Sequence, residues 1–310
     1  MSSPMNSAET SAEQRRRGRM GIGVIGAGRV GAVLGAALRA AEHAVVGVSA
    51  VSEESRERAA NLLPGVPILD IPDVIERSEL VLLAVPDDAL GPLVSGLAAT
   101  GAWQPGQLVA HTSGRFGTGI LEPARRAGVI PLALHPAMTF TGMSLDLTRL
   151  ADCSFGVTAP VGVLPIAQAL VVEMGAEPVV IEEADRVNYH AALAHASNHL
   201  VTITAQSTQL LREIGVENPE RLLGPLMRAS LENALASGEN ALTGPVARGD
   251  AGTVQAHLEA LAQDGAADLR DAYLALSLAT ARRAMARGLL SESRGRAVLE
   301  ALGAEQDGPR

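Results

Sequence analysis

The stretch MGIGVIGAGRVG, residues 20–31, decides the fold of the first part of the chain. Its apolar first half, residues 20–25, predicts a buried strand, and a helical pattern follows at residues 30–41. In this context GxGxxG is typical of a dinucleotide-binding turn, because glycine permits the tight turn, the approach of a pyrophosphate and close helix packing. The helix N-terminus adds an attraction for anions. A tight turn without a ligand is the alternative, and the predicted cofactor-binding residues are Gly26, Ala27, Gly28, Arg29, Val30 and Gly31.

Short apolar runs alternate with helical patterns outward from this turn. The predicted strands are residues 20–25, 44–49, 66–69, 80–85, 107–111, 130–134, 154–158 and 178–181. Strand–helix alternation favours parallel crossovers, so we expect an α/β fold with a doubly wound, Rossmann-type sheet.

The pattern changes after residue 183. From residue 184 onward the sequence shows only Ala- and Leu-rich helical periodicity, with breaks at residues 215–219, 237–250 and 288–291. We therefore predict a disordered tail at 1–19, a dinucleotide-binding domain at 20–183, an all-α domain for substrate binding and dimerisation at 184–304, and a tail at 305–310.

Charge and composition restrict the classes of partner. Of the 310 residues, 25 are Lys or Arg and 34 are Asp or Glu, which gives a net charge of −9 and argues against nucleic acid as a partner. We find no apolar run of the roughly 18–20 residues that span a membrane, and no signal-peptide core after the basic residues 15–19. Cys153 is the single cysteine, so an internal disulfide is excluded and a reducing cytoplasm is expected.

All 25 basic residues are arginine, and the sequence contains no lysine. Schiff-base chemistry on the chain, pyridoxal phosphate attachment, a P-loop lysine and a lysine general acid are therefore excluded. A proton donor must be His, Asp, Glu, Tyr, Cys or water, because the charge of arginine is effectively fixed.

The end of the second strand bears on the choice of cofactor. NAD-binding proteins usually place an acid there for the ribose 2′-hydroxyl, whereas this chain reads VSAVS at residues 48–52. A 2′-phosphate would meet no repulsion, so NADP is favoured over NAD, with Ser49, Ser52, Arg29 and Arg56 available to bind it. Capping the next helix is the alternative role of Ser52.

Three further strand ends carry polar residues. Val85, Pro86 and Asp87 end one strand and are predicted to lie along the dinucleotide, although the acids Asp87 and Asp88 could instead simply cap the next helix. His111 and Ser113 end another strand, and His135 ends a third. Carboxyl ends of parallel strands form the ligand-binding crevice, so we expect His111 and His135 at the nicotinamide end.

The first helix of the second domain carries the other candidates. His190 and Asn198 share one broad face of it beside small alanines, which suits a wall facing a ligand or another helix. His195 and His199 have the i, i+4 spacing of a metal pair, but no third ligand follows in the HExxH pattern, so we predict no metal site. A later turn carries Thr243, Arg248 and Asp250 as candidate substrate-binding residues; Arg248 could clamp a carboxylate or pair with Asp250, and helix capping is the other alternative.

In order and spacing these motifs resemble a bacterial family with an N-terminal Rossmann-like domain and a C-terminal helical domain of unknown function. The motifs are the glycine turn, Val85-Pro86-Asp87, His111-Thr-Ser-Gly, Leu134-His135-Pro136, Tyr189-His190 with Ser197-Asn198, and residues 242–250. The family is similar in architecture to ketopantoate reductase, pyrroline-5-carboxylate reductase, 6-phosphogluconate dehydrogenase and deazaflavin-dependent NADP oxidoreductases. The resemblance implies NADP binding, a homodimer through the helical domain and, for some members, ketopantoate reduction in pantothenate synthesis.

One departure concerns the proton. The better-known reductases use a lysine four residues before the asparagine, and this chain has Ala194 there. We expect an NADP-dependent reductase of a small anionic 2-oxo acid, ketopantoate being the best candidate. His190 or His135 would supply the proton, while Asn198 and Ser113 would hydrogen-bond the carbonyl oxygen. The alternatives are a reductase of a cyclic imine and an NADP-binding sensor without turnover.

Overall fold

The computed structural model describes residues 19–262 and 267–304. The chain divides into two compact units, Met1–Ala196 and Ser197–Arg310, which are described in turn. The predicted tails at 1–19 and 305–310 lie outside the described residues, apart from Arg19. No helix in the described ranges is both long and apolar enough to cross a membrane.

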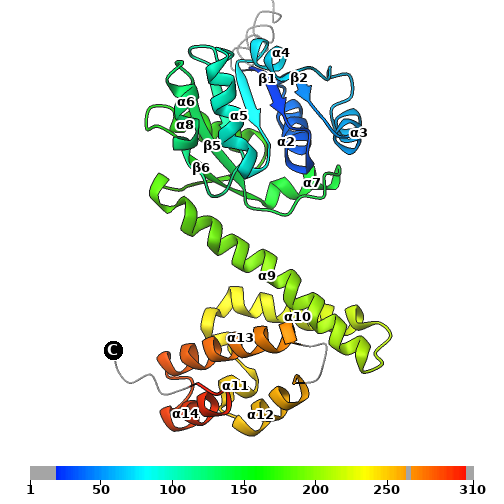
Figure 1. The fold of residues 1–310 in the computed structure, drawn as a ribbon, viewed down its shortest axis with the longest axis vertical. Helices are drawn as coiled ribbons and strands as arrows, with labels where there is room; N and C mark the ends of the chain where they lie inside the picture. Colours follow the sequence, from blue (N-terminus) through cyan, green and yellow to red (C-terminus); the bar gives the residue numbers. More distant parts are fainter. Residues whose placement is uncertain (1–18, 263–266, 305–310) are drawn as a thin grey trace, which may run out of the picture. The chain divides into compact units, whose positions relative to one another are not determined.

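A seven-stranded sheet forms the centre of the first unit (Figure 1). Its order is β2-β1-β3-β4-β5-β6-β7, which confirms the predicted Rossmann-type α/β fold. The pairs from β2 to β5 are parallel, β6 is antiparallel to β5, and β7 is parallel to β6. The strands are β1 Gly21–Ile25, β2 Ala44–Ser49, β3 Leu80–Leu83, β4 Leu108–His111, β5 Ile130–Pro136, β6 Ser154–Thr158 and β7 Glu177–Val180.

One predicted strand is wrong. The run at residues 66–69 is not a strand of the sheet and makes only an isolated bridge between Ile68 and Val48. Pro67 lies inside this run and has no N–H to donate to a ladder, which limits the pairing. His111 and His135 therefore belong to the fourth and fifth strands of the sheet rather than the fifth and sixth.

Side chains alternate between the two faces of the sheet and build one core on each. In β3, Leu80 and Leu82 pack into the core that contains α2, whereas Val81 and Leu83 pack into the core that contains α5. The elements of this unit are α2 Arg29–Ala40, α3 Glu53–Leu62, α4 Ile71–Glu76, α5 Asp87–Ala99, η1 Thr118–Leu121, α6 Glu122–Arg125, α7 Leu145–Arg149, η2 Leu150–Asp152, α8 Leu164–Glu173 and η3 Glu183–Asp185.

Helix α9, Arg186–Glu213, begins in the first unit and continues into the second. The second unit is helical and has a small core around Val254, Ala281 and Val298. Its further elements are α10 Pro219–Ser237, η4 Gly238–Ala241, α11 Gly244–Arg248, α12 Ala251–Ala260, α13 Ala267–Ala286 and α14 Glu292–Ala301. The three predicted breaks coincide with helix ends, and the end of α12 at Ala260 is an additional one. The predicted domain boundary at 183–184 stays a prediction.

Candidate functional site

The glycine turn has the geometry that its sequence predicts. Gly26 has a φ of 97°, which favours glycine, and its N–H and that of Ala27 donate to the Ser49 carbonyl oxygen at 3.1 Å. A Cβ on Gly31 would lie 2.0 Å from the Gly26 oxygen, whereas one on Gly28 would meet nothing within 4 Å. The open backbone at Gly28 precedes α2, whose N-cap has no side-chain hydrogen bond. The turn therefore fits a pyrophosphate group.

Arg58 lies beside this turn, although no motif in the sequence singles it out. Its Nη1 donates to the Ala27 carbonyl oxygen at 3.1 Å. A Cβ on Gly142 would lie 2.6 Å from Arg58 Nε and 3.2 Å from Arg29 Cα, so these groups are close neighbours. A binding role for Arg58 could not be predicted from the sequence, because an arginine inside a helix such as α3 usually lies on a solvated face.

Ser49 and Ser52 occupy different environments. Ser49 is buried and its carbonyl oxygen holds the glycine turn. Ser52 is the N-cap of α3, and its Oγ accepts the Ser55 N–H at 3.2 Å. The capping role foreseen for Ser52 is therefore present, and a contact with a cofactor stays a prediction for both serines.

The segment Val85-Pro86-Asp87 leads from β3 into α5. Pro86 is the N-cap residue and Asp87 the first residue of the helix. The Asp87 carboxylate lies 3.6 Å from Nε of Arg115. Its negative charge also acts on the imidazoles of His111 and His135. Asp87 therefore lies at the same edge of the sheet as the predicted nicotinamide site.

His111 organises the loop that follows β4. Its ring is fully buried, Nδ1 accepts the Ser113 N–H at 3.2 Å, and Nε2 lies 2.8 Å from the Gly117 oxygen. Since Nδ1 accepts, Nε2 carries the proton and donates to Gly117. Burial lowers the pKa of His111 to about 4. Ser113 is buried as well, and its Oγ accepts the Phe116 N–H at 3.4 Å.

Two predicted histidines meet at the end of this loop. The rings of His135 and His190 lie edge to face with centroids 5.8 Å apart. A Cβ on Gly114 would lie 2.5 Å from His190 Cδ2 and 2.9 Å from His135 Nε2. The two imidazoles therefore flank a position of the loop that has room only for glycine. Burial, followed by the charges of His190 and Arg186, lowers the pKa of His135 to about 4.

Tyr189 completes this cluster and was not predicted as a site residue. Its hydroxyl lies 2.9 Å from Nδ1 of His135, and the two rings are edge to face at 5.6 Å. A Cβ on Gly156 of β6 would lie 2.6 Å from the hydroxyl oxygen, so a glycine makes room for the phenol. The name acid–base cluster is used below for Gly114, His135, Tyr189 and His190.

Arg186 lies one helical turn before Tyr189, and its residue is only 1 % exposed. Its Nε donates to Thr158 Oγ1 at 2.7 Å, and Nη2 donates to the carbonyl oxygens of Ala133 and Gly156 at 3.0 Å. Burial lowers the pKa of the guanidinium. Its buried Nη1 has no hydrogen-bond partner within the described residues, and the Glu183 carboxylate acts on the guanidinium without a direct ion pair.

Glu183 fixes the far end of the His111 loop. Its carboxylate accepts the N–H of Thr118 at 2.7 Å and that of Gly119 at 3.0 Å. A Cβ on Gly117 would lie 2.2 Å from the same carboxylate. The loop that carries Ser113 and Gly114 is therefore held by His111 at one end and by Glu183 at the other.

The remaining candidates belong to the second unit. Asn198 is exposed on α9, Thr243 precedes α11, and Arg248 is exposed at the end of that helix. Asp250 is the N-cap of α12 and accepts the Thr253 N–H at 3.1 Å and its hydroxyl at 2.7 Å. These bonds, with a smaller effect of Arg248, lower the pKa of Asp250. The capping alternative is therefore present for Asp250.

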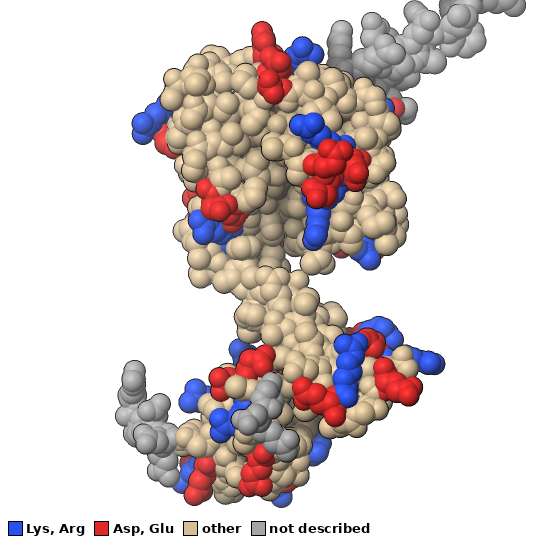
Figure 2. Space-filling model, turned by 45° about the vertical axis from the view of Figure 1, so that its right-hand side comes forward, with Lys and Arg blue, Asp and Glu red and all other residues tan. Residues whose placement is uncertain are grey.

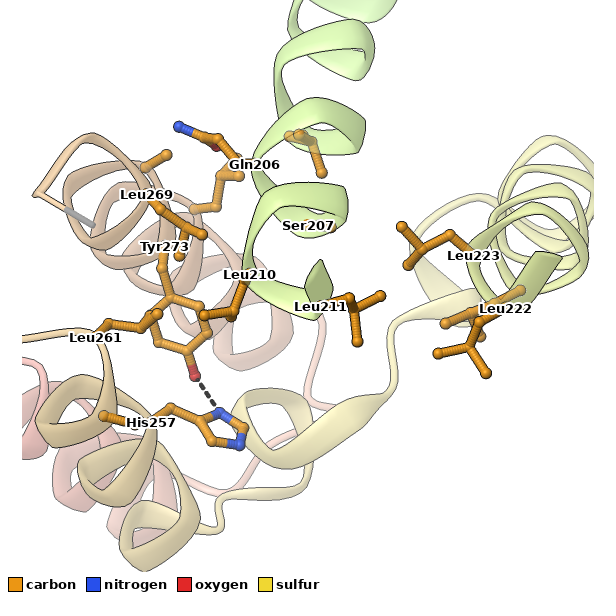
Figure 3. A pocket seen from close by; sticks show the side chains of 15 residues that line it. Gln206, Ser207, Leu210, Leu211, Leu222, Leu223, His257, Leu261, Leu269 and Tyr273 are labelled. Carbon is orange, nitrogen blue, oxygen red and sulfur yellow. Dashed lines mark hydrogen bonds between the residues drawn. The ribbon is translucent and has the colours of Figure 1, made fainter. Parts of the chain in front are cut away.

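An apolar groove of about 510 Å³ also lies in the second unit (Figure 3). Leucines of α9, α10 and α13 line it, and its polar pair is His257 Nδ1 and the Tyr273 hydroxyl, 2.9 Å apart. Within residues 19–262 and 267–304, no group of three or more His, Cys, Asp or Glu side chains could hold a metal ion. On the face shown in Figure 2, acidic and basic side chains are interspersed.

Comparison with known families supports the two-part architecture. Residues 3–136 match the model of a Rossmann-like domain, and residues 153–280 match that of a domain of unknown function, DUF2520. The resemblance inferred from the motifs is thereby confirmed at the level of these two domains. No curated protein sequence matches the chain.

Solved structures share the fold at low sequence identity. A candidate NADP oxidoreductase from Bacteroides fragilis is 22% identical, with a TM-score of 0.71 over 85% of this chain and 98% of that one. A protein from Thermotoga maritima is 22% identical, with a TM-score of 0.63 over 86% and 99%. A 1-pyrroline-5-carboxylate reductase from Streptococcus pyogenes is 16% identical, with a TM-score of 0.54 over 92% and 99%.

The buried histidines make the stability of the first unit depend on pH. The folded-state pKa values of His111 and His135 are depressed to about 4, below the ordinary 6.5, so the unfolded chain binds more protons in between. We expect the free energy of unfolding to fall as the pH is lowered from 6.5 to 4, and less steeply in His135→Asn. Urea unfolding followed by the fluorescence of Trp103, the single tryptophan, measures this.

The matched control is His257→Gln, which alters an exposed histidine of the second unit. It should leave unchanged the pH dependence of the free energy of unfolding that Trp103 fluorescence reports. Equal slopes in the parent and in His135→Asn would contradict a buried neutral His135.

Proposed function

We propose that the protein is an oxidoreductase that uses NADPH to reduce a small 2-oxo acid, with ketopantoate as the specific substrate. The observation that carries the proposal is that the glycine turn, the loop with Gly114 and His135 lie at the carboxyl ends of β1, β4 and β5, in the parallel part of the sheet, where α9 adds Tyr189 and His190 beside His135. In open α/β sheets this edge binds ligands. A bound nicotinamide cofactor supplies hydride there, and the protein must orient the substrate and deliver a proton.

The charge of the cluster suits an anionic substrate. His135, Tyr189 and His190 carry no carboxylate, and Arg186 places a buried positive charge behind them. Of the two nearby acids, Asp87 lies 3.6 Å from Arg115, and Glu183 accepts backbone N–H groups of the His111 loop. A carboxylate substrate therefore meets little repulsion. For Ser113, in the first unit, we propose a hydrogen bond to the carbonyl oxygen. The substrate-binding roles of Asn198, Thr243, Arg248 and Asp250, in the second unit, stay predictions from the sequence.

The first experiment follows NADPH absorbance in the presence of purified protein and ketopantoate, with NADH as the cofactor control. We expect NADPH oxidation, and a loss of roughly a hundredfold or more in kcat for Asn198→Ala with folding intact, because a hydrogen bond to developing negative charge is removed. Leu289→Ala, at an exposed position after α13, is the matched control and should keep parental turnover. Binding of NADPH without ketopantoate reduction would refute the substrate assignment.

A second candidate reaction is reduction of a cyclic imine. The missing lysine favours it, because an imine that is already protonated needs no proton on oxygen, and the pyrroline-5-carboxylate reductase noted above shares the fold. The same assay with a panel of cyclic imines separates the two reactions. An NADP-binding protein that reduces neither class would instead fit the sensor alternative.

We propose Arg58 as a determinant of NADP over NAD. It borders the glycine turn beside Arg29, and its guanidinium can bind a phosphate in two-pronged fashion. Arg58→Ala should raise the Kd of NADPH roughly tenfold, as the loss of about 1.4 kcal/mol would, with a smaller effect on NADH. Calorimetric titration measures both, and Arg77→Ala, at an exposed position after α4, is the control. An equal change for both cofactors would contradict this role.

We also propose a homodimer formed through the helical unit. Helix α10 exposes Leu222 and Leu226 on one side, and Leu231 and Leu235 about half a turn round. A helix that is apolar on opposite sides is normally buried on both. In addition, residues 197–211 of α9, which lie in the second unit, contain no Asp, Glu or Arg. A second copy of the chain would cover these surfaces.

Sedimentation velocity tests the dimer. We expect a dimer for the parent protein and a monomer for Leu226→Glu/Leu235→Glu, because two buried charges without partners would oppose association. Val161→Glu, at a position 90% exposed in the first unit, is the control and should remain dimeric. A parent protein that sediments as a monomer would contradict the proposal.

A further inference from the structure

We propose that Tyr189 is the source of the proton in the reduction, that His135 passes it to the substrate oxygen, and that Arg186 provides the counter-charge for the resulting phenolate. This inference rests on the proposed reductase function and assigns the role that a lysine plays in related enzymes. It follows from three observations on the first unit: the hydrogen bond between Tyr189 and His135, the close approach of His135 Nε2 to Gly114, and the buried Arg186 guanidinium, which has no direct ion pair within the described residues.

The groups of the cluster differ in whether they hold a proton near neutral pH. Burial keeps His135 neutral, with a pKa of about 4, so an imidazolium is not its resting form. Burial raises the pKa of Tyr189, so the phenol keeps its proton. Both nitrogens of His111 are already engaged with its own loop. The neutral pair of Tyr189 and His135 is therefore the proton store of the cluster.

The hydrogen bond between them fixes a direction of transfer. When the phenol donates to Nδ1 of His135 across 2.9 Å, the ring carries its own proton on Nε2. Nε2 lies beside Gly114, where a Cβ would be 2.9 Å away. The proton-bearing nitrogen thus borders a part of the loop that has no side chain. A neutral imidazole is known to act as the donor in enzymes of other folds.

The transfer balances without a charged histidine. The Nε2–H bond breaks as the substrate oxygen gains that proton, and the Tyr189 O–H bond breaks as Nδ1 gains the other. His135 is neutral before and after, and one negative charge moves from the substrate oxygen to the phenolate. The electron pair is the hydride from the cofactor. A water proton that enters at Nε2 afterwards returns the Nδ1 proton to Tyr189.

The positive charge of Arg186 lowers the free energy of the phenolate form of Tyr189. Its guanidinium carbon lies 5.8 Å from the centre of the Tyr189 ring, and its hydrogen bonds go to neutral oxygens of Thr158, Ala133 and Gly156. Arg186 makes no direct ion pair within the described residues, and the Glu183 carboxylate acts on it from a longer distance, so a transient phenolate beside the guanidinium is stabilised. The positive charge accordingly lowers the pKa of Tyr189, against the effect of burial.

Other charged or titratable groups face the pair from the neighbouring elements. Cys153, just before β6, opposes ionisation of Tyr189, and the Gly156 backbone favours it. His190 on α9 and His111 on β4 oppose protonation of His135, and Asp87 on α5 favours it. Burial raises the pKa of the Cys153 thiol to about 11, so this thiol stays neutral in the working range. Glu183 of η3 also acts, on Arg186 and on His111. The fixed positive charge beside Tyr189 is that of Arg186.

The chain contains only two tyrosines, which permits a direct titration of Tyr189. In Tyr273→Phe, Tyr189 is the single tyrosine, and the near-ultraviolet absorbance of tyrosinate against pH gives its pKa without cofactor or substrate. In this background Arg186→Met should raise the pKa of Tyr189, whereas Arg186→Lys, which keeps the charge, should leave it near the parental value. Trp103 fluorescence checks that each variant is folded.

Turnover supplies the second readout. In Tyr189→Phe we expect kcat to fall by roughly 10²- to 10⁴-fold with an unchanged Kd for NADPH, because proton delivery is lost while binding is kept. Tyr273→Phe should retain parental turnover.

An unchanged pKa of Tyr189 in folded Arg186→Met would overturn the role of Arg186. Parental kcat in Tyr189→Phe would overturn Tyr189 as the proton source and leave the reductase standing. Absence of turnover in the parent with any oxo acid or imine would refute the proposed function and the relay with it, even where the titration shows coupling.

Discussion

The burial of the Arg186 guanidinium is the interaction on which the site depends. It joins the carbonyl oxygens of β5 and β6, two antiparallel strands, to the first turn of α9. Because α9 begins at this anchored residue, Tyr189 and His190 fall one turn later against the end of β5. The same contact that fixes the helix to the sheet thus brings together residues that lie 54 positions apart, as in the pair of His135 and Tyr189.

Glycines provide the space that this arrangement requires. Gly156 leaves room for the phenol against β6, and Gly114 leaves room for two imidazoles beside the loop. A third close approach, between Gly31 and Gly26, brings α2 against the glycine turn. In each place a Cβ would fall within 2.6 Å of another atom, so the backbone and a functional group occupy volume that other residues would fill. The site depends on absent side chains as much as on those present.

The predictable part of the fold came from local patterns. An apolar run followed by GxGxxG identified β1, the turn and α2, because strand, turn and helix each leave a short-range signature. The breaks between helices were also predicted, since Gly, Pro and Asn mark helix ends. The run at residues 66–69 shows the limit of this approach. Its β-branched residues fit a strand, yet Pro67 restricts it to one bridge. The reversal of β6 was not predicted either, because strand direction depends on which neighbour a strand finds.

By itself, the sequence determined the dinucleotide turn, the presence of His111 and His135 at the edge of the sheet, and the absence of any lysine for proton delivery. Only the tertiary structure decided what these residues do to one another. In the folded chain His111 hydrogen-bonds its own loop, and Arg58 lies beside the glycine turn. Tyr189 contacts His135, and Arg186 lies next to the Tyr189 ring. The physical reason is that periodicity fixes which face of an element is apolar, whereas hydrogen bonds between distant segments, and the pKa values that follow from burial, depend on how the elements pack.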